Sequence, residues 1–248
     1  NPAAGVWTFD ELDEVMDLAH AHGIRVNLGT ATASPAPWVT TRHPEILPVA
    51  EDGTRRFPGG RQAYCPSSPV FRGYAAELSR RVVERYADHP ALAMWHVSNE
   101  LGCHNALCYC DASAVAFREW LKARYGTVAA LNTAWGTSFW SQRYSAWDQI
   151  LPPMAALSLR NPAQLLDFQR FSSDQQLELY RAEARVIRER STAPVTTNFM
   201  VTAHIRALDY FSWAGEMDVI ANDHYLDRRL PEPLAELSHE EGYLEEKA

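Results

Sequence analysis

The sequence places one carboxyl group where acid–base chemistry is expected. Glu100 follows Asn99 just after residues 91–97, a continuous apolar run of strand length. Burial at the end of such a strand favours the protonated form of a carboxyl group, which a general acid requires. The Asn99 amide can hydrogen-bond a substrate hydroxyl, so the pair fits glycoside hydrolysis, which also needs a second carboxyl group. In the alternative interpretation, Glu100 only begins a helix and interacts with its dipole.

Cysteine residues form a second candidate site. Cys103, Cys108 and Cys110 lie within eight residues of one another, whereas Cys65 stands apart. Four cysteines are too few for a disulfide scaffold in a chain of 248 residues, and clustered thiols are typical of metal sites. The alternative is a group of buried, reduced thiols that bind no metal.

The elements that would position these groups alternate between helix and strand. Four stretches have the composition of buried parallel strands: 24–29, 91–97, 195–199 and 218–222. Four others have the apolar spacing of helices: 8–22, 71–87, 112–125 and 163–190. Thr8 and Glu11 have the spacing of a capping box, which would make Thr8 the N-cap of the first helix.

Polar segments follow the carboxyl ends of these strands, where α/β barrels hold their active sites. The longest, 30–69, is predicted to be a loop, and an excursion rich in Trp and Pro covers 135–162. A complete (β/α)₈ barrel needs eight strands. The fold is therefore predicted to be α/β, with only part of such a barrel in this chain.

Composition argues against several classes of partner and location. The net charge is −8 and no run of Lys or Arg is present, so we expect no nucleic-acid partner. No window approaches the ~20 apolar residues of a membrane span, so no membrane association is expected. The first residues lack the pattern of a signal peptide, and we therefore expect a cytoplasmic location.

The stretch from Trp95 to His104 resembles the acid/base strand of glycoside hydrolase family 42, the β-galactosidases. Further stretches resemble this family in the same order: 32–38, 43–49, 64–69, 108–110, 134–144 and 196–200. The resemblance implies that the chain holds about strands 3 to 6 of a (β/α)₈ barrel domain, residues 1–225. A polar tail, 226–248, does not resemble the family.

This resemblance implies a retaining β-galactosidase that acts by double displacement. Glu100 would be the general acid/base, and Asn99 would bind the sugar hydroxyl next to the anomeric carbon. The family's nucleophile, a Glu at the end of strand 7, is expected to be missing from this chain; Asp223 is the best local substitute. The chemistry needs no cofactor, the substrate would be a β-galactoside, and the parent protein is expected to be a homo-oligomer, a trimer by the resemblance.

The resemblance also gives roles to two aromatic residues. Trp140 would stack on the sugar ring, and Tyr225 would face the same pocket. Alternatively, Trp140 belongs to a core cluster with other aromatic residues of the excursion.

Relatives with a zinc site use four cysteines, which correspond to Cys65, Cys108, Cys110 and the position of Ser113. The fourth ligand of a structural zinc is therefore uncertain here, with Cys103 or His104 as the candidate.

Two other functions remain open from the sequence. The chain could be an inactive barrel fragment or sugar-binding remnant, or its parent could hydrolyse a different β-glycoside with retention. The preference for galactose rests on the resemblance alone.

Overall fold

Parallel strands form the centre of the fold. In the computed structural model, which describes residues 1–200 and 207–223, three strands pair in chain order: β1 (Val26–Gly29), β2 (Leu92–His96) and β3 (Val195–Thr196). β4 (Asn198–Phe199) pairs in parallel with β5 (Ala221–Asn222). The predicted strand 195–199 is thus two short strands around Thr197, one pairing with each neighbour. All four predicted strand regions are confirmed, each shorter than expected.

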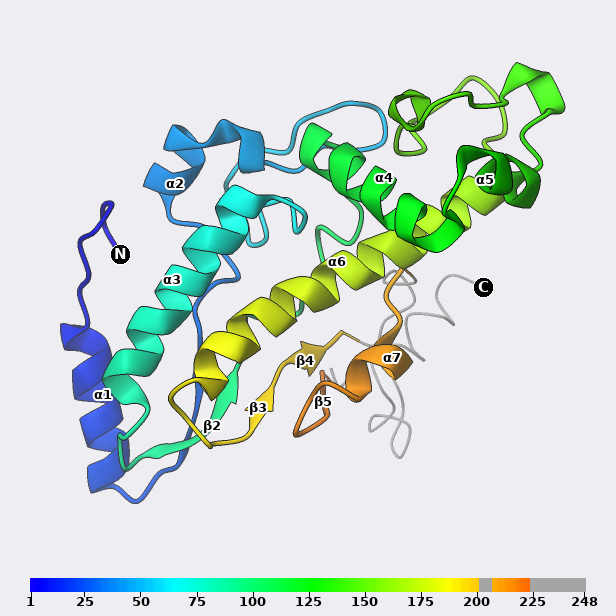
Figure 1. Cartoon of the computed structure of the whole chain (residues 1–248). Helices are drawn as coiled ribbons and strands as arrows, with labels where there is room; N and C mark the ends of the chain where they lie inside the picture. The colour runs from blue at the N-terminus through cyan, green and yellow to red at the C-terminus, as the bar shows by residue number, and fades with distance from the viewer. Residues whose placement is uncertain (201–206, 224–248) are drawn as a thin grey trace, which may run out of the picture.

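Four long helices accompany the strands (Figure 1). They are α1 (Asp10–Ala21), α3 (Pro69–Tyr86), α4 (Asp111–Tyr125) and α6 (Pro162–Arg188). Each agrees with a predicted helix to within two residues at either end. The predicted N-cap Thr8 is wrong, because the helix begins at Asp10 after Phe9 and has no side-chain cap. An acidic first turn interacts favourably with the helix dipole instead.

Short helices lie outside the four predicted helices. α2 (Pro37–Arg42) and η1 (Pro44–Ile46) interrupt the predicted loop 30–69, and each begins with a proline, whose fixed φ suits the first turn. The other short helices are α5 (Val128–Trp135), η2 (Phe139–Ser141), η3 (Trp147–Gln149) and α7 (Tyr210–Ala214).

Apolar side chains form two main cores. The larger lies between the strands and helices α1, α3 and α6, and includes Trp95, Tyr180 and Val195, none of them exposed. The smaller core joins α4, α5 and the first part of α6 around Phe117. Figure 1 shows this second group at the N-terminal end of α6, beyond the strands.

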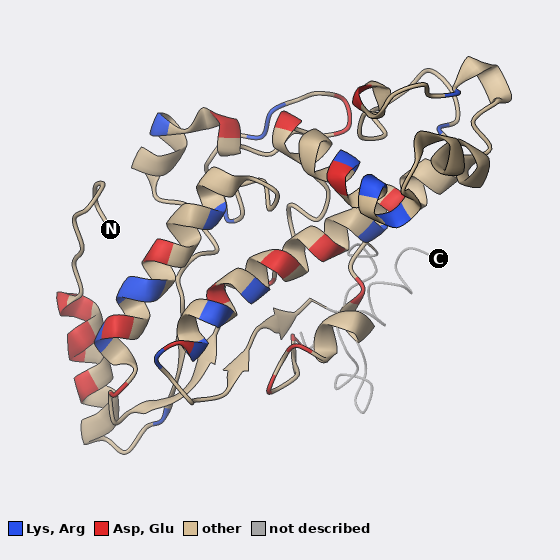
Figure 2. Ribbon diagram, in the orientation of Figure 1, with Lys and Arg blue, Asp and Glu red and all other residues tan. Residues whose placement is uncertain are grey.

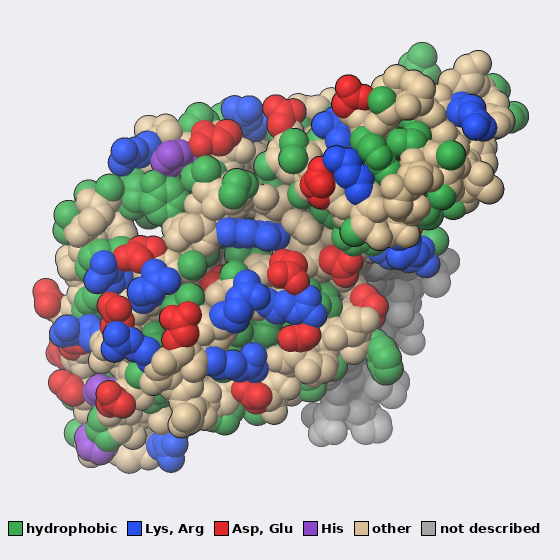
Figure 3. All heavy atoms as spheres, in the orientation of Figure 1, with side chains coloured by type: hydrophobic (Ala, Val, Ile, Leu, Met, Phe, Trp, Pro, Cys, Tyr) green, Lys and Arg blue, Asp and Glu red, His purple; other side chains and the backbone are tan. Residues whose placement is uncertain are grey.

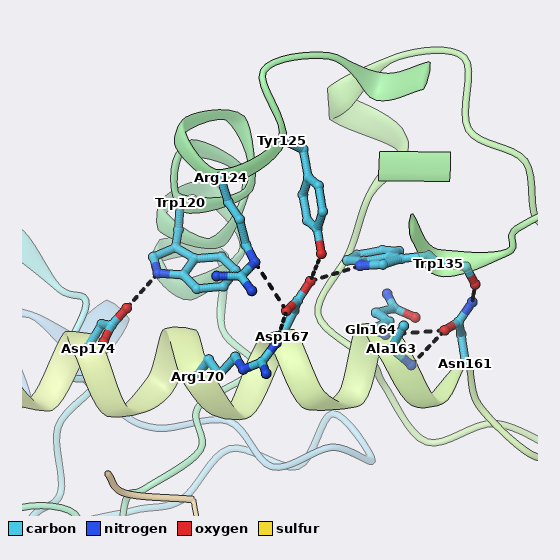
Figure 4. A network of polar contacts seen from close by, with 10 residues as sticks. All are labelled: Trp120, Arg124, Tyr125, Trp135, Asn161, Ala163, Gln164, Asp167, Arg170 and Asp174. Carbon is cyan, nitrogen blue, oxygen red and sulfur yellow. Dashed lines mark hydrogen bonds and ion pairs between the residues drawn. The ribbon is translucent and has the colours of Figure 1, made fainter. Parts of the chain in front are cut away.

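A buried carboxylate connects the helices of the smaller core (Figure 4). Asp167 on α6 accepts hydrogen bonds from the Tyr125 hydroxyl (2.5 Å) and the Trp135 indole N–H (2.9 Å). Its other oxygen lies 3.2 Å from the Arg170 guanidinium. One side chain therefore ties α4 and α5 to α6.

The outer surface carries charges of both signs. Acidic and basic residues both occur along α3 and α6 (Figure 2), and charged side chains of both signs are mixed over this face of the molecule (Figure 3). Within residues 1–200 and 207–223, no helix combines the length and apolar composition that a membrane crossing needs.

Candidate active site

Glu100 lies in the turn that follows β2, at the carboxyl end of the parallel strands. Its side chain is 4% exposed, and its Oε2 lies 2.6 Å from Nη2 of Arg61. Ser98 and Glu100 have φ angles of 55° and 47°, in the left-handed region that non-glycine residues rarely occupy. Such backbone strain clusters at functional sites. The structure thus places the predicted acid/base residue in a buried, strained turn.

Side chains from the neighbouring strands hold the backbone of this turn. The amide N–H of Ser98 donates to Oγ1 of Thr30, which follows β1 (2.9 Å). The amide N–H of Glu100 donates to Oδ1 of Asn198 on β4 (2.8 Å). The turn is therefore fixed from both sides of β2.

Asn198 also brings a second carboxylate into the site. Its Nδ2 donates to Oδ2 of Asp223 (2.8 Å), and its Oδ1 lies 2.9 Å from Nε2 of His96. Asp223, the local candidate for a nucleophile, is thereby joined to Glu100 through one amide. The sequence interpretation missed Asn198, although its place near the end of a predicted strand, 195–199, was a usable signal.

Another buried carboxyl group lies behind the turn. Glu183 on α6 has no exposed surface and accepts hydrogen bonds from the hydroxyls of Thr30 (2.7 Å), Thr32 (2.9 Å) and Ser79 (2.9 Å). Burial raises the pKa of Glu183 to about 7, although these hydroxyls oppose the shift. Thr30 therefore links Glu183 to the backbone of Ser98.

Three residues were predicted to bind the sugar: Asn99, Trp140 and Tyr225. The two that the structure describes, Asn99 and Trp140, do not form one group. Asn99 is half-buried in the Glu100 turn. Trp140 is 59% exposed, stacks on Phe139 with ring centres 4.5 Å apart and lines a cavity of about 710 Å³. Among the described residues, the lining of that cavity includes neither Asn99 nor Glu100. Tyr225 lies outside the residues that the structure describes.

The structure brings three of the four cysteines together. Cys65 precedes α3, and Cys108 and Cys110 precede α4; their Sγ atoms all lie within 4.8 Å of one another. Hydrogen bonds from the other two thiols lower the pKa of Cys110. The Ser113 hydroxyl lies 3.2 Å from Sγ of Cys65. Within the part of the chain described, Cys103 is not a member of this group.

Cys103 instead belongs to the Glu100 turn. Its amide N–H donates to the backbone oxygen of Glu100 (2.9 Å). Burial raises the pKa of the Cys103 thiol, and the nearby Glu100 carboxylate adds to the shift. The two cysteine environments are therefore distinct.

Comparisons with known proteins agree on one family. The model of glycoside hydrolase family 42, described as beta-galactosidase, matches residues 1–244. The chain is 54% identical to a beta-galactosidase of Arthrobacter sp. over 96% of its own length, and 46% identical to the beta-galactosidase bgaB of Geobacillus kaustophilus over 92%. It spans about a third of each relative, 34% in both cases.

A solved structure has the same fold. The beta-galactosidase of the haloarchaeon Halorubrum lacusprofundi superimposes with a TM-score of 0.87 at 40% identity, covering 95% of this chain and 36% of that one. The α/β arrangement described above is therefore also that of about a third of this beta-galactosidase.

Proposed function

The chain belongs to glycoside hydrolase family 42, and from this membership we propose that the full-length polypeptide containing it is a retaining β-galactosidase. The observation that carries the proposal is Glu100, buried in a strained turn at the carboxyl ends of the parallel strands. Family membership and the order of the strand pairs also support the assignment of the strands to positions 3 to 6 of a (β/α)₈ barrel.

Glu100 would serve both steps of the reaction. In the first, its proton passes to the glycosidic oxygen as the bond from that oxygen to the anomeric carbon breaks, and a second carboxylate attacks this carbon. In the second, Glu100 takes a proton from the water that displaces this carboxylate. The Arg61 guanidinium lies 2.6 Å from Oε2 of Glu100 and would stabilise the negative charge that this group carries when it acts as the base. The nucleophile would come from a segment beyond these residues, with Asp223 as the alternative.

Aryl β-galactoside hydrolysis by the full-length polypeptide tests this proposal. Glu100→Ala is expected to lower kcat/KM for the p-nitrophenyl substrate by about 10²-fold or more, because general acid–base catalysis contributes 10²–10⁴-fold. Glu119→Ala changes an exposed helix glutamate and is the matched control.

Full activity in Glu100→Ala would contradict the assignment of the general acid. Faster hydrolysis of the β-glucoside than of the β-galactoside would favour a different β-glycoside as the substrate. Activity of residues 1–248 alone that Asp223→Ala abolishes would place the nucleophile within this chain.

We also propose that the group formed by Cys65, Cys108 and Cys110 holds a structural zinc ion. Zinc sites of this kind are closed, four-coordinate and rich in thiolates. Three converging buried thiols would supply three of the four ligands. The fourth would be the Ser113 hydroxyl, which lies 3.2 Å from Sγ of Cys65, or a water molecule. The ion would tie the segment before α3 to the segment before α4 and would take no part in the hydrolysis.

Metal analysis of the purified protein tests the zinc site. We expect about one zinc per chain, bound as in other closed thiolate sites, and its loss in Cys110→Ser, together with a lower Tm. Cys103→Ser is the control and should retain the metal, because Cys103 lies in the Glu100 turn. Zinc retained in Cys110→Ser but lost in Cys103→Ser would refute this ligand set.

A trimeric parent protein, which the family resemblance implies, is a further part of this proposal. Light scattering of the full-length polypeptide tests it, and a monomer at working concentration would contradict it.

A further inference from the structure

Three residues around the Glu100 turn have backbone angles that L-amino acids rarely adopt. Ser98, Glu100 and Gln62 have φ angles of 55°, 47° and 61°. A non-glycine residue in this region persists only where the surrounding contacts determine its conformation. The contacts that fix this backbone therefore also fix the carboxyl group of Glu100.

Gln62 lies in the loop after β1, and its side-chain amide forms hydrogen bonds with the backbone of the Glu100 turn. Its Nε2 donates to the backbone oxygens of Glu100 (2.5 Å) and Asn99 (3.0 Å). Its Oε1 accepts from the amide N–H of His104 (2.8 Å). Gln62 is only 2% exposed, so these bonds are shielded from water. One amide thus uses both donors and its acceptor to bracket residues 99–104.

The preceding residue holds the carboxyl group itself. Nη2 of Arg61 lies 2.6 Å from Oε2 of Glu100. Gln62 holds the backbone of Glu100, and Arg61 holds its side chain. Two adjacent residues therefore fix both the backbone and the carboxyl group of Glu100. Of the two, Gln62 is the buried member, whereas the side chain of Arg61 is 44% exposed.

We propose that Gln62 is a positioning residue for acid–base catalysis by Glu100, a role that rests on the proposed β-galactosidase function. Both proton transfers need a Glu100 oxygen within hydrogen-bond reach of the reacting oxygen. A displacement of ~1 Å in such a group costs about 10²-fold in rate. Gln62 acts through Glu100 and not on the substrate.

Gln62→Glu is the sharpest test, because it preserves size but replaces the amide donor with an oxygen that repels the two carbonyl groups. kcat/KM is compared for methyl β-galactoside, whose departing alkoxide needs the proton of Glu100, and 2,4-dinitrophenyl β-galactoside, whose leaving group needs little protonation. The fold decrease in kcat/KM for methyl β-galactoside should exceed that for 2,4-dinitrophenyl β-galactoside by about tenfold or more, since general acid catalysis raises the rate by 10²–10⁴-fold. Any loss of folded protein or of galactose binding cancels in this ratio.

Two further variants of the full-length polypeptide complete the experiment. Gln62→Ala removes the same bonds without adding a charge and should show the same selective loss. Asn132→Asp makes the same amide-to-acid exchange in a buried residue that brackets another loop, through the backbone oxygen (2.8 Å) and N–H (3.0 Å) of Tyr144. This control should affect both substrates equally.

Equal losses on the two substrates in both Gln62 variants would overturn the proposal. Unfolding of both variants, while Asn132→Asp folds, would also overturn it, because the amide would then serve only the fold. Failure of the proposed function is recognised separately: the unsubstituted polypeptide would hydrolyse neither galactoside.

Discussion

At the scale of single residues, Glu183 shows how a buried carboxyl group couples the fold to pH. Its pKa is raised from the ordinary 4.5 to about 7 because it is fully buried, and the hydroxyls of Thr30, Thr32 and Ser79 only partly offset the burial. The folded state therefore binds its proton more tightly than the unfolded chain does. The corresponding stability is fully present below pH 4.5 and is lost as the pH rises through about 7.

Glu183→Gln should remove this pH dependence. Between pH 5 and pH 8, the free energy of unfolding of the unsubstituted protein should fall relative to that of the variant, by up to about 3 kcal/mol. Urea unfolding of both proteins at the two pH values measures the difference, in which other titrating groups cancel. Parallel pH profiles would show that Glu183 titrates alike in the folded and unfolded states.

At the scale of elements, Asp167 helps to hold α4 and α5 against α6. Its carboxylate is 2% exposed. It accepts hydrogen bonds from Tyr125 and Trp135 and forms an ion pair with Arg170 (Figure 4). Hydrogen bonds to a buried charged group contribute more to stability than hydrogen bonds at the surface do. Removal of the acceptor also leaves buried donors without a partner.

Asp167→Ala should therefore destabilise the protein by about 3 kcal/mol. Asp174→Ala is the matched control, since Asp174 also accepts an indole N–H, that of Trp120 at 2.7 Å, but in an exposed position. Asp174→Ala should lower the free energy of unfolding by less than about 1 kcal/mol. Chemical denaturation followed by tryptophan fluorescence compares the two variants, and equal costs would contradict a special role for the buried carboxylate.

At the scale of the whole molecule, two apolar cores support different parts of the chain. The larger core supports the strands whose carboxyl ends carry Glu100, Asn198 and Asp223. The smaller core, around Phe117, supports the excursion that carries Trp140. The Glu100 turn and the stacked pair of Phe139 and Trp140 are thus supported by different cores, and among the described residues the lining of the cavity beside Trp140 does not include Glu100.

The sequence alone determined the elements and the place of Glu100, the predicted acid/base residue. Local patterns are enough to find β2 and α6, because a strand buried on both faces leaves a continuous apolar run and an amphipathic helix repeats its apolar residues at helical spacing. It also placed Glu100 at the end of an apolar strand and Cys108 beside Cys110, since these features lie close together in the chain. Cys65 joins these two cysteines, without Cys103, only in the folded structure. Thr8 misled the prediction, because the helix begins only at Asp10 and its first turn has no side-chain cap.

Only the tertiary structure decided which side chains meet Glu100. Gln62 and Asn198 lie 38 and 98 residues away in the sequence, and a contact at such separation leaves no periodic signal. Strand pairing in chain order brings Asn198 and Asp223 to the same edge as Glu100, and the folded loop after β1 delivers Gln62. The place of the Glu100 carboxyl group was readable from its neighbours in sequence, but its geometry depends on residues that meet it only in space.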